Sequence, residues 1–163
     1  VTGHRRENIG QNFINICNAI KSIAGDYPGI QIIFAMHMNP QVVDELTVNL
    51  FGYSNIHLIP PQDYLTFVWL MYCSLIIMTD SGGIQEEAPS FDKPVLVTRD
   101  TTERPEAIEC GAALLVGTKT KYIYQCVKTL LENKEVFKKM ENSDNPFGHG
   151  KTAEKILESL DDR

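Results

Sequence analysis

The sequence lacks the features that mark membrane-spanning and nucleic-acid-binding proteins. No apolar run approaches the roughly 20 residues of a membrane span, and no signal-peptide pattern is recognisable. Against 15 Lys and Arg stand 21 Asp and Glu, and the resulting net charge of −6 argues against a broad surface for nucleic acid. We expect a cytoplasmic globular protein whose partners include neither nucleic acid nor a membrane. An acidic protein still binds one small anion where backbone N–H groups and a few cations gather.

Cysteine is scarce, and none of the four residues belongs to a C-x-x-C pair. Their apolar or helical contexts predict buried free thiols in a reducing cytosol. The four are Cys17, Cys73, Cys110 and Cys126. His37, His57 and His149 are separated in the sequence and lack metal-ligand spacing, so we expect no metal site and no cofactor. The fingerprints G-x-x-x-x-G-K-[ST], G-x-G-x-x-G and G-x-S-x-G are absent too.

Short apolar runs alternate with amphipathic helical stretches, which is typical of a parallel sheet covered by helices on both faces. We predict strands at 31–37, 55–59, 75–80, 93–98 and 112–116. Helices are predicted around the stripe Phe13–Ile23, at 40–50, at 63–74 as a buried helix opened by Asp63, and from 119 onward with an interruption at 145–151. The length fits one α/β, Rossmann-like three-layer domain. Its start without Met, inside a strand-like segment, we interpret as an excised piece.

A glycine turn follows the most apolar predicted strand, in the run T-D-S-G-G-I-Q-E-E. Gly82 and Gly83 allow a ligand to approach the backbone closely, and the next helix begins with unpaired N–H groups. With the Ser81 hydroxyl, these groups suit a phosphate or diphosphate at the carboxyl edge of the sheet. Glu87, further along the helix, suits two vicinal hydroxyls such as those of a ribose. The alternatives are a merely structural turn and a solvated helix glutamate.

Three further charged or rigid segments are candidates for the same site. G-H-R-R-E-N offers His4 for a phosphate or sugar oxygen, and Arg5 and Arg6 for forked contacts to oxyanions, unless it is a charged surface turn. D-T-T-E-R-P-E-A offers Arg104, unless the loop is a rim stabilised by its own Glu–Arg pairs. P-P-Q-D-Y-L-T-F offers Gln62 for a base edge and Phe67 for stacking, unless Phe67 belongs to the core.

These motifs occur in the order and spacing of a known family. Together with K-P-V-L-V-x-R-D-x-T-E-R-P-E-A and N-P-F-G-H-G-K, they resemble the non-hydrolysing UDP-N-acetylglucosamine (UDP-GlcNAc) 2-epimerases of bacteria over essentially the whole chain. The resemblance implies two Rossmann-like lobes in a glycosyltransferase type B-like arrangement, with the active site between them. Residues 1–163 would be the C-terminal, UDP-binding lobe. The N-terminal lobe, which carries the acidic residues acting on the C2 proton, would be absent.

The resemblance also implies roles for individual residues at the substrate. Gln62 would meet the uracil edge and Phe67 would stack on or beside the uracil. Ser81, Gly82 and Gly83 would hold the diphosphate, and Glu87 the ribose hydroxyls. The ligands would be UDP-GlcNAc and UDP-ManNAc, interconverted by elimination of UDP and re-addition through 2-acetamidoglucal.

Further implied residues lie near the phosphates and in a second site. His4, as a catalytic residue, and Arg104 would complete the substrate site. Arg5, Glu7 and His37 match positions that the family uses for a second, regulatory UDP-GlcNAc. We expect a homodimer in the full-length enzyme and no epimerase activity from residues 1–163 alone.

Three other functions stay open at this point. A donor-binding lobe of a UDP-sugar glycosyltransferase shares the glycine turn and the glutamate on the ribose. A hydrolysing epimerase would release UDP and free ManNAc. A free-standing nucleotide-binding module would have no chemistry of its own.

Overall fold

Five short parallel strands and the first two residues of the chain form the centre of the molecule. The computed structural model describes residues 1–148 and 150–161, so His149 of the N-P-F-G-H-G-K motif lies outside the described residues. β1 (Ile32–Ala35) pairs with β2 (Ile56–Ile59), and β4 (Val95–Val97) lies between β3 (Ile77–Thr79) and β5 (Ala113–Leu115). The predicted strands are therefore all present, each shorter than expected.

The segment Val1–Thr2 joins the two groups of strands. The Ala35 N–H donates to the Val1 carbonyl, and the Thr2 N–H donates to the Met78 carbonyl, both at 3.0 Å. Thr2 also forms a parallel bridge with Thr79. The resulting order, β2–β1–(Val1–Thr2)–β3–β4–β5, is that of a doubly wound Rossmann sheet, in which the chain direction across the sheet reverses between the central segment and β3.

Side chains of the central strands alternate between two cores, because successive residues of a strand point to opposite faces. Met78 and Leu96 belong to the larger core, whereas Ile77, Val95 and Val97 belong to the smaller one. The fold class predicted from the sequence, an α/β three-layer domain, is confirmed.

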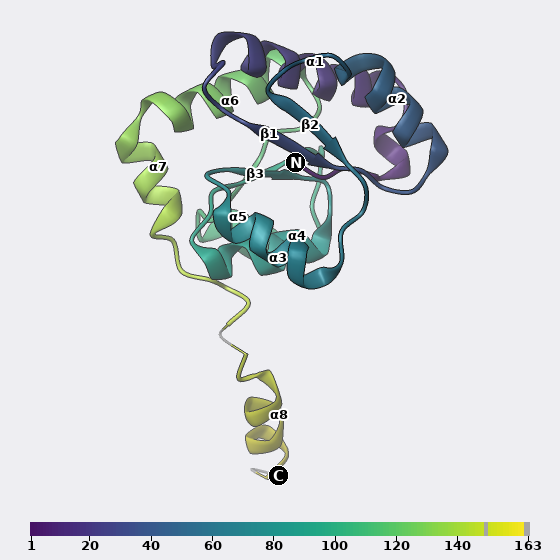
Figure 1. The fold of residues 1–163 in the computed structure, drawn as a ribbon. Helices are drawn as coiled ribbons and strands as arrows, with labels where there is room; N and C mark the ends of the chain where they lie inside the picture. Colours follow the sequence, from purple (N-terminus) through teal and green to yellow (C-terminus); the bar gives the residue numbers. More distant parts are fainter. Residues whose placement is uncertain (149, 162–163) are drawn as a thin grey trace.

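Two layers of helices cover the sheet (Figure 1). The larger core contacts α1 (Gln11–Asp26), α2 (Pro40–Leu50), α6 (Thr120–Glu132) and α7 (Lys134–Glu141). The smaller core contacts α3 (Tyr64–Cys73), α4 (Gly82–Glu87), the 3-10 helix η2 (Ala88–Phe91) and α5 (Pro105–Glu109). A further 3-10 turn, η1, spans Arg6–Asn8, and α8 (Thr152–Asp161) stands apart from the body. The helical region predicted from 119 onward is thus three helices: α6 and α7 are separate at Asn133, and α8 begins after the predicted interruption.

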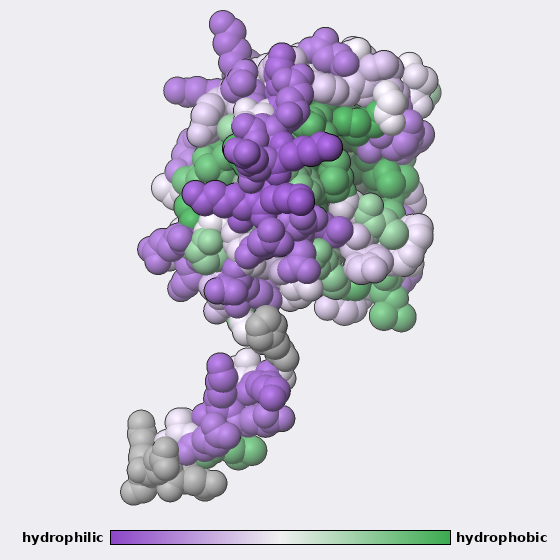
Figure 2. Space-filling model, turned by 90° about the vertical axis from the view of Figure 1, so that its left-hand side faces the viewer, coloured by the Kyte–Doolittle hydropathy of each residue, from purple (hydrophilic) through white to green (hydrophobic). Residues whose placement is uncertain are grey.

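The prediction that α3 is a buried helix is wrong. Asp63 does cap it, accepting a hydrogen bond from the Thr66 N–H at 3.0 Å, but only Met71 of the helix is buried. Leu65 and Trp69 are 78% and 61% exposed. The helix packs on the sheet along one narrow stripe, so its remaining apolar side chains face outward. On the side of the molecule shown in Figure 2, apolar side chains are likewise exposed between polar ones.

The same exposure corrects the expectation for the cysteines. Cys17 and Cys126 are buried free thiols as predicted, and burial raises the pKa of Cys17 to about 12. Cys110 is half-buried, whereas Cys73, at the end of α3, is exposed. The sequence context of Cys73 is apolar because α3 is apolar all round.

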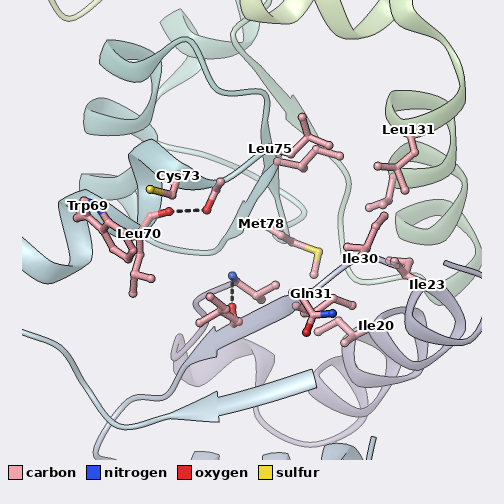
Figure 3. Close-up of a pocket in the computed structure, with 16 residues that line it drawn as sticks. Ile20, Ile23, Ile30, Gln31, Trp69, Leu70, Cys73, Leu75, Met78 and Leu131 are labelled. Carbon is pink, nitrogen blue, oxygen red and sulfur yellow. Dashed lines mark hydrogen bonds between the residues drawn. The ribbon is translucent and has the colours of Figure 1, made fainter. Parts of the chain in front are cut away.

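An apolar cavity of about 430 Å³ opens where β1 and β3 begin (Figure 3). We call it the central slot; its lining includes Val1, Ile33, Leu70, Met78 and Leu131. It lies beside Val1, whose amino group donates to the Ile33 carbonyl at 2.7 Å. The slot is at the amino edge of the sheet, opposite the carboxyl ends of the strands. Among the described residues no helix is long and apolar enough to cross a membrane.

Candidate functional site

The candidate site lies where the central segment and β3 end, at the point where the sheet order reverses. Ligands of doubly wound sheets bind outside the carboxyl ends of the strands at this position. Two loops leave the sheet there, Gly3–Asn8 after the central segment and Asp80–Gly83 after β3. A third, Arg99–Arg104, follows β4. The three loops carry most of the residues that the sequence singled out.

Asp80 is the anchor that joins the first two loops. Its side chain is fully buried and accepts hydrogen bonds from the backbone N–H of His4 at 3.0 and 3.1 Å and of Arg5 at 2.9 Å. A third donor, the Asn8 side-chain amide, lies 3.1 Å away and also donates to the Thr98 carbonyl. Sequence reasoning assigned no role to Asp80 or Asn8. The available signal was a carboxylate directly after an uninterrupted apolar strand, where burial requires donors from elsewhere in the chain.

The glycine turn is open toward solvent. The Ser81 N–H donates to the Thr79 hydroxyl at 3.0 Å, but no side chain caps α4, and within the described residues neither the Gly82 nor the Gly83 N–H has a protein acceptor. Neither glycine has a positive φ. A Cβ atom at either position would meet nothing closer than 3.9 Å. Neither backbone strain nor crowding by protein explains the two glycines, so the space they leave is available to a ligand.

Gln85 holds the third loop against this turn. It is fully buried; its amide donates to the Ser81 carbonyl at 3.1 Å, and its carbonyl oxygen accepts from the Thr102 hydroxyl at 2.6 Å. The same hydroxyl accepts from the Arg104 N–H at 3.0 Å. Because all these groups are satisfied by one another, the start of α4 and the third loop are held in one arrangement.

Arg99, at the end of β4, connects the first and third loops. Its side chain is 5% exposed and donates to both carboxylate oxygens of Glu103, at 2.5 and 2.9 Å, and to Glu7 at 2.7 Å. The forked contact to Glu103 is the strong, directional form of an ion pair. It raises the pKa of Arg99 and lowers the pKa of Glu103 to about 2.

This contact predicts an acid sensitivity. Because the folded-state pKa of Glu103 lies below its ordinary value of 4.5, the stabilisation is complete above that pH and is lost as the pH falls toward about 2. We expect the free energy of unfolding of Glu103→Gln to fall less than that of the unsubstituted protein as the pH is lowered from 4.5 toward 2. Urea unfolding of both proteins at about pH 5 and about pH 3 measures this. Equal losses would show that the pair does not contribute.

Arg5, in the first loop, borders the glycine turn, and His4 precedes it in the same loop. An Arg5 nitrogen lies 3.9 Å from where a Cβ of Gly82 would be, and 3.9 Å from the Glu103 carboxylate. The His4 ring stacks on His37, with centroids 4.7 Å apart and an angle of 10° between the planes. The structure therefore brings Arg5 and His37, predicted for a second nucleotide, next to His4 of the predicted substrate site.

Arg104 is engaged within the protein. Its guanidinium pairs with Glu86 and donates to the Glu103 carbonyl at 2.9 Å. The sequence left open that this loop is a rim stabilised by Glu–Arg pairs, and such pairs are present. For Arg104 to contact a phosphate, its guanidinium would have to leave Glu86 and bind the ligand instead.

The predicted nucleoside-binding residues lie along the start of α3 and the end of α4. Glu87 accepts a hydrogen bond from the Tyr64 hydroxyl at 3.1 Å, and this contact raises the pKa of Tyr64. Gln62 donates to the Pro60 carbonyl at 2.6 Å, which stiffens the Pro-Pro segment. Phe67 is half-buried against the smaller core. Tyr64, 66% exposed beside Glu87, is a candidate that sequence reasoning missed.

Comparisons with known proteins identify the family of the chain. The family model of UDP-N-acetylglucosamine 2-epimerase matches residues 1–161. The chain is 50% identical over 160 residues to the UDP-N-acetylglucosamine 2-epimerase of Yersinia pestis, a match that covers 98% of this chain and 43% of that protein.

Solved structures match equally well. The UDP-GlcNAc 2-epimerase from Neisseria meningitidis bound to UDP-GlcNAc is 48% identical with a TM-score of 0.94, over 99% of this chain and 44% of that one. The S. aureus MnaA–UDP structure is 41% identical with a TM-score of 0.93, over 98% of this chain and 44% of that one. The chain thus spans less than half the length of these relatives.

The family match runs through every segment that builds the site, from the first loop to the region after α7. Half of the aligned positions are identical in one relative, and the backbone of another superposes over almost the whole chain. The chain belongs to the UDP-N-acetylglucosamine 2-epimerase family.

Proposed function

We propose that this chain is the C-terminal, UDP-binding lobe of a two-lobed cytoplasmic enzyme that interconverts UDP-GlcNAc and UDP-ManNAc without releasing free sugar. The observation that carries the proposal is the family match over residues 1–161, with solved relatives bound to UDP-GlcNAc and to UDP. The remaining length of those relatives leaves room for a second lobe, which would supply the acidic residues acting on C2. The complete enzyme would be a homodimer.

In the proposed complex, the diphosphate lies at the turn Ser81–Gly83. The free N–H groups at the start of α4 carry partial positive charge, and the two glycines leave space for phosphate oxygens. The Ser81 hydroxyl adds a donor, and His4 and Arg104 complete the contacts. Glu87 would accept hydrogen bonds from the ribose hydroxyls, which would replace the bond that it accepts from Tyr64.

The nucleoside would extend along the segment before α3. Gln62 would present backbone and side-chain groups to the uracil edge, and Phe67 would stack on or beside the ring. The stiffness of the Pro60–Gln62 segment supports this placement, because a preformed ledge loses little conformational freedom when a base binds.

The reaction makes the diphosphate site part of catalysis. The C2–H bond is not acidic, because C2 has no neighbouring carbonyl, so direct deprotonation is prohibitive. Elimination of UDP from C1 as the C2 proton leaves gives 2-acetamidoglucal, and re-addition after protonation on the other face inverts C2. Negative charge grows on the departing phosphate, so donors at Ser81–Gly83 stabilise the transition state more than the ground state, each by about 3 kcal/mol in favourable cases.

Ser81→Ala in the full-length protein tests the proposal. We expect UDP affinity to fall by about tenfold, because one hydrogen bond to a charged group is lost, and epimerisation to fall further, by up to about a hundredfold, because the bond strengthens in the transition state. Titration calorimetry with UDP and detection of UDP-ManNAc formed from UDP-GlcNAc measure the two effects. Ser54→Ala, at an exposed serine remote from the site, is the matched control.

Two outcomes would overturn the assignment. Normal epimerisation by Ser81→Ala, in a protein that has lost UDP affinity, would separate this turn from the reaction. Transfer of GlcNAc to an acceptor without formation of UDP-ManNAc would identify a glycosyltransferase lobe instead.

A further inference from the structure

The Tyr64 hydroxyl binds the carboxylate that the proposed function assigns to the ribose. Glu87 accepts a hydrogen bond from this hydroxyl at 3.1 Å through Oε2, and among the described residues no other donor reaches its carboxylate. The neighbouring Glu86 is paired with Arg104, whereas Glu87 has no ion pair in the described part of the chain. Glu87 therefore depends on one neutral donor, at the C-terminal end of α4, where the helix dipole does not stabilise a negative charge.

This hydrogen bond joins the two helices that carry the two ends of the proposed UDP site. Gln62 and Phe67, proposed for the uracil, lie on either side of Tyr64 along the chain, and the turn proposed for the diphosphate opens α4. Glu87 follows Gly83 by four residues, which is about 6 Å along a helix. Because the ribose of UDP connects the uracil to the diphosphate, its hydroxyls would reach the carboxylate that Tyr64 contacts.

The Tyr64 side chain can leave Glu87 without disturbing the fold around it. Tyr64 is the first residue of α3, and the Asp63 cap, which accepts from the Thr66 N–H at 3.0 Å, fixes this helix start independently of the tyrosine ring. The side chain is 66% exposed, so its hydroxyl can bind water when it turns away. A ribose offers two hydroxyls to the carboxylate, so the exchange favours the ribose but costs the bond from Tyr64.

We propose that Tyr64 is a competitor of the ribose for Glu87: the nucleotide binds by replacing the Tyr64 hydroxyl, and this replacement lowers the affinity for UDP. The inference rests on the proposed function and adds to it a residue that weakens nucleotide binding. The net free energy of one hydrogen bond is lost when the nucleotide binds and is regained when it leaves. Tyr64 therefore favours release of the nucleotide from a site that otherwise holds it through many contacts.

The test compares Tyr64→Phe with the unsubstituted full-length enzyme in titration calorimetry. Phenylalanine keeps the ring and removes only the hydroxyl, so we expect UDP to bind about threefold to tenfold tighter. The KM for UDP-GlcNAc should fall by a similar factor while kcat does not rise, because the ribose contact is the same in the ground state and in the transition state. Tyr124→Phe, in the other helix layer, removes a hydroxyl that donates to Asp26 at 2.6 Å; this matched control should leave UDP affinity unchanged.

The ligand 2′,3′-dideoxy-UDP separates the competition from other effects of the substitution. It offers no ribose hydroxyl to Glu87 and so does not replace Tyr64, and we expect Tyr64→Phe to bind it with the affinity of the unsubstituted enzyme. Unchanged or weaker binding of UDP by Tyr64→Phe would overturn the inference while leaving the proposed function intact, as would equal tightening of both ligands. An unsubstituted enzyme that does not bind UDP would instead overturn the proposed function, and the inference with it.

Discussion

Asp80→Ala is expected to lower the free energy of unfolding by about 3 kcal/mol or more. The substitution removes a fully buried carboxylate and leaves the N–H groups of His4 and Arg5 and the amide of Asn8 without their acceptor. Each buried donor left unsatisfied costs roughly 1–3 kcal/mol, and water entering the cavity offsets part of the sum. Urea unfolding followed by circular dichroism measures the change.

The same substitution should weaken UDP binding, because Asp80 fixes the loop that carries His4 and Arg5. Asp80→Asn preserves the shape of the side chain, but its NH2 group cannot accept a hydrogen bond from the backbone N–H groups of His4 and Arg5. We therefore expect an intermediate loss of stability. Asp44→Asn, at an exposed aspartate of α2, is the matched control and should change stability by less than about 0.5 kcal/mol. Stability of Asp80→Ala equal to that of this control would contradict the anchoring role.

Gly82→Ala is expected to have opposite effects on binding and on stability. The residue has an ordinary φ and lies at the first position of α4, and the added methyl group would meet nothing closer than 3.9 Å. Alanine there should raise the free energy of unfolding by up to about 1 kcal/mol, because it restricts the unfolded chain. The same methyl group occupies the space proposed for phosphate oxygens, so UDP affinity should fall roughly tenfold to a hundredfold.

Gly117→Ala provides the contrast. Gly117 has a φ of 61°, and a Cβ there would lie 3.1 Å from an Asp100 carboxylate oxygen, so alanine should destabilise the fold. It lies after β5 and not at the glycine turn, so the substitution should lower the UDP affinity of the folded protein less than Gly82→Ala does. If Gly82→Ala behaved like Gly117→Ala, the glycine would be a requirement of the fold rather than of a ligand.

The sequence predicted best what depends on neighbouring residues. The helix at 40–50 has the predicted bounds, because Pro40 and the Asn39 cap mark its start locally. The Asp63 cap of α3 is confirmed for the same reason. Burial of α3 was predicted wrongly, because exposure of Trp69 depends on what packs against the helix and not on its own composition.

The candidate site was only partly predictable. The loops with His4 and Ser81 were found because parallel strands end at one edge of a sheet, so charged and glycine-rich strand ends meet there. The contacts that order the loops join Arg5 to Asp80 and Glu7 to Arg99, across 75 and 92 positions of the chain. A single sequence gives no signal for such pairs, so these contacts became visible only in three dimensions. The roles of the individual residues at UDP stay predictions.

Val1 and Thr2 lie between the two groups of strands, beside the central slot. Backbone hydrogen bonding between the two groups passes through Val1 and Thr2, whereas β1–β2 and β3–β4–β5 are each continuous ladders. Because the loops of His4 and Asp80 leave neighbouring positions of the sheet and are joined by hydrogen bonds, a molecule bound between these loops would contact both groups of strands at once.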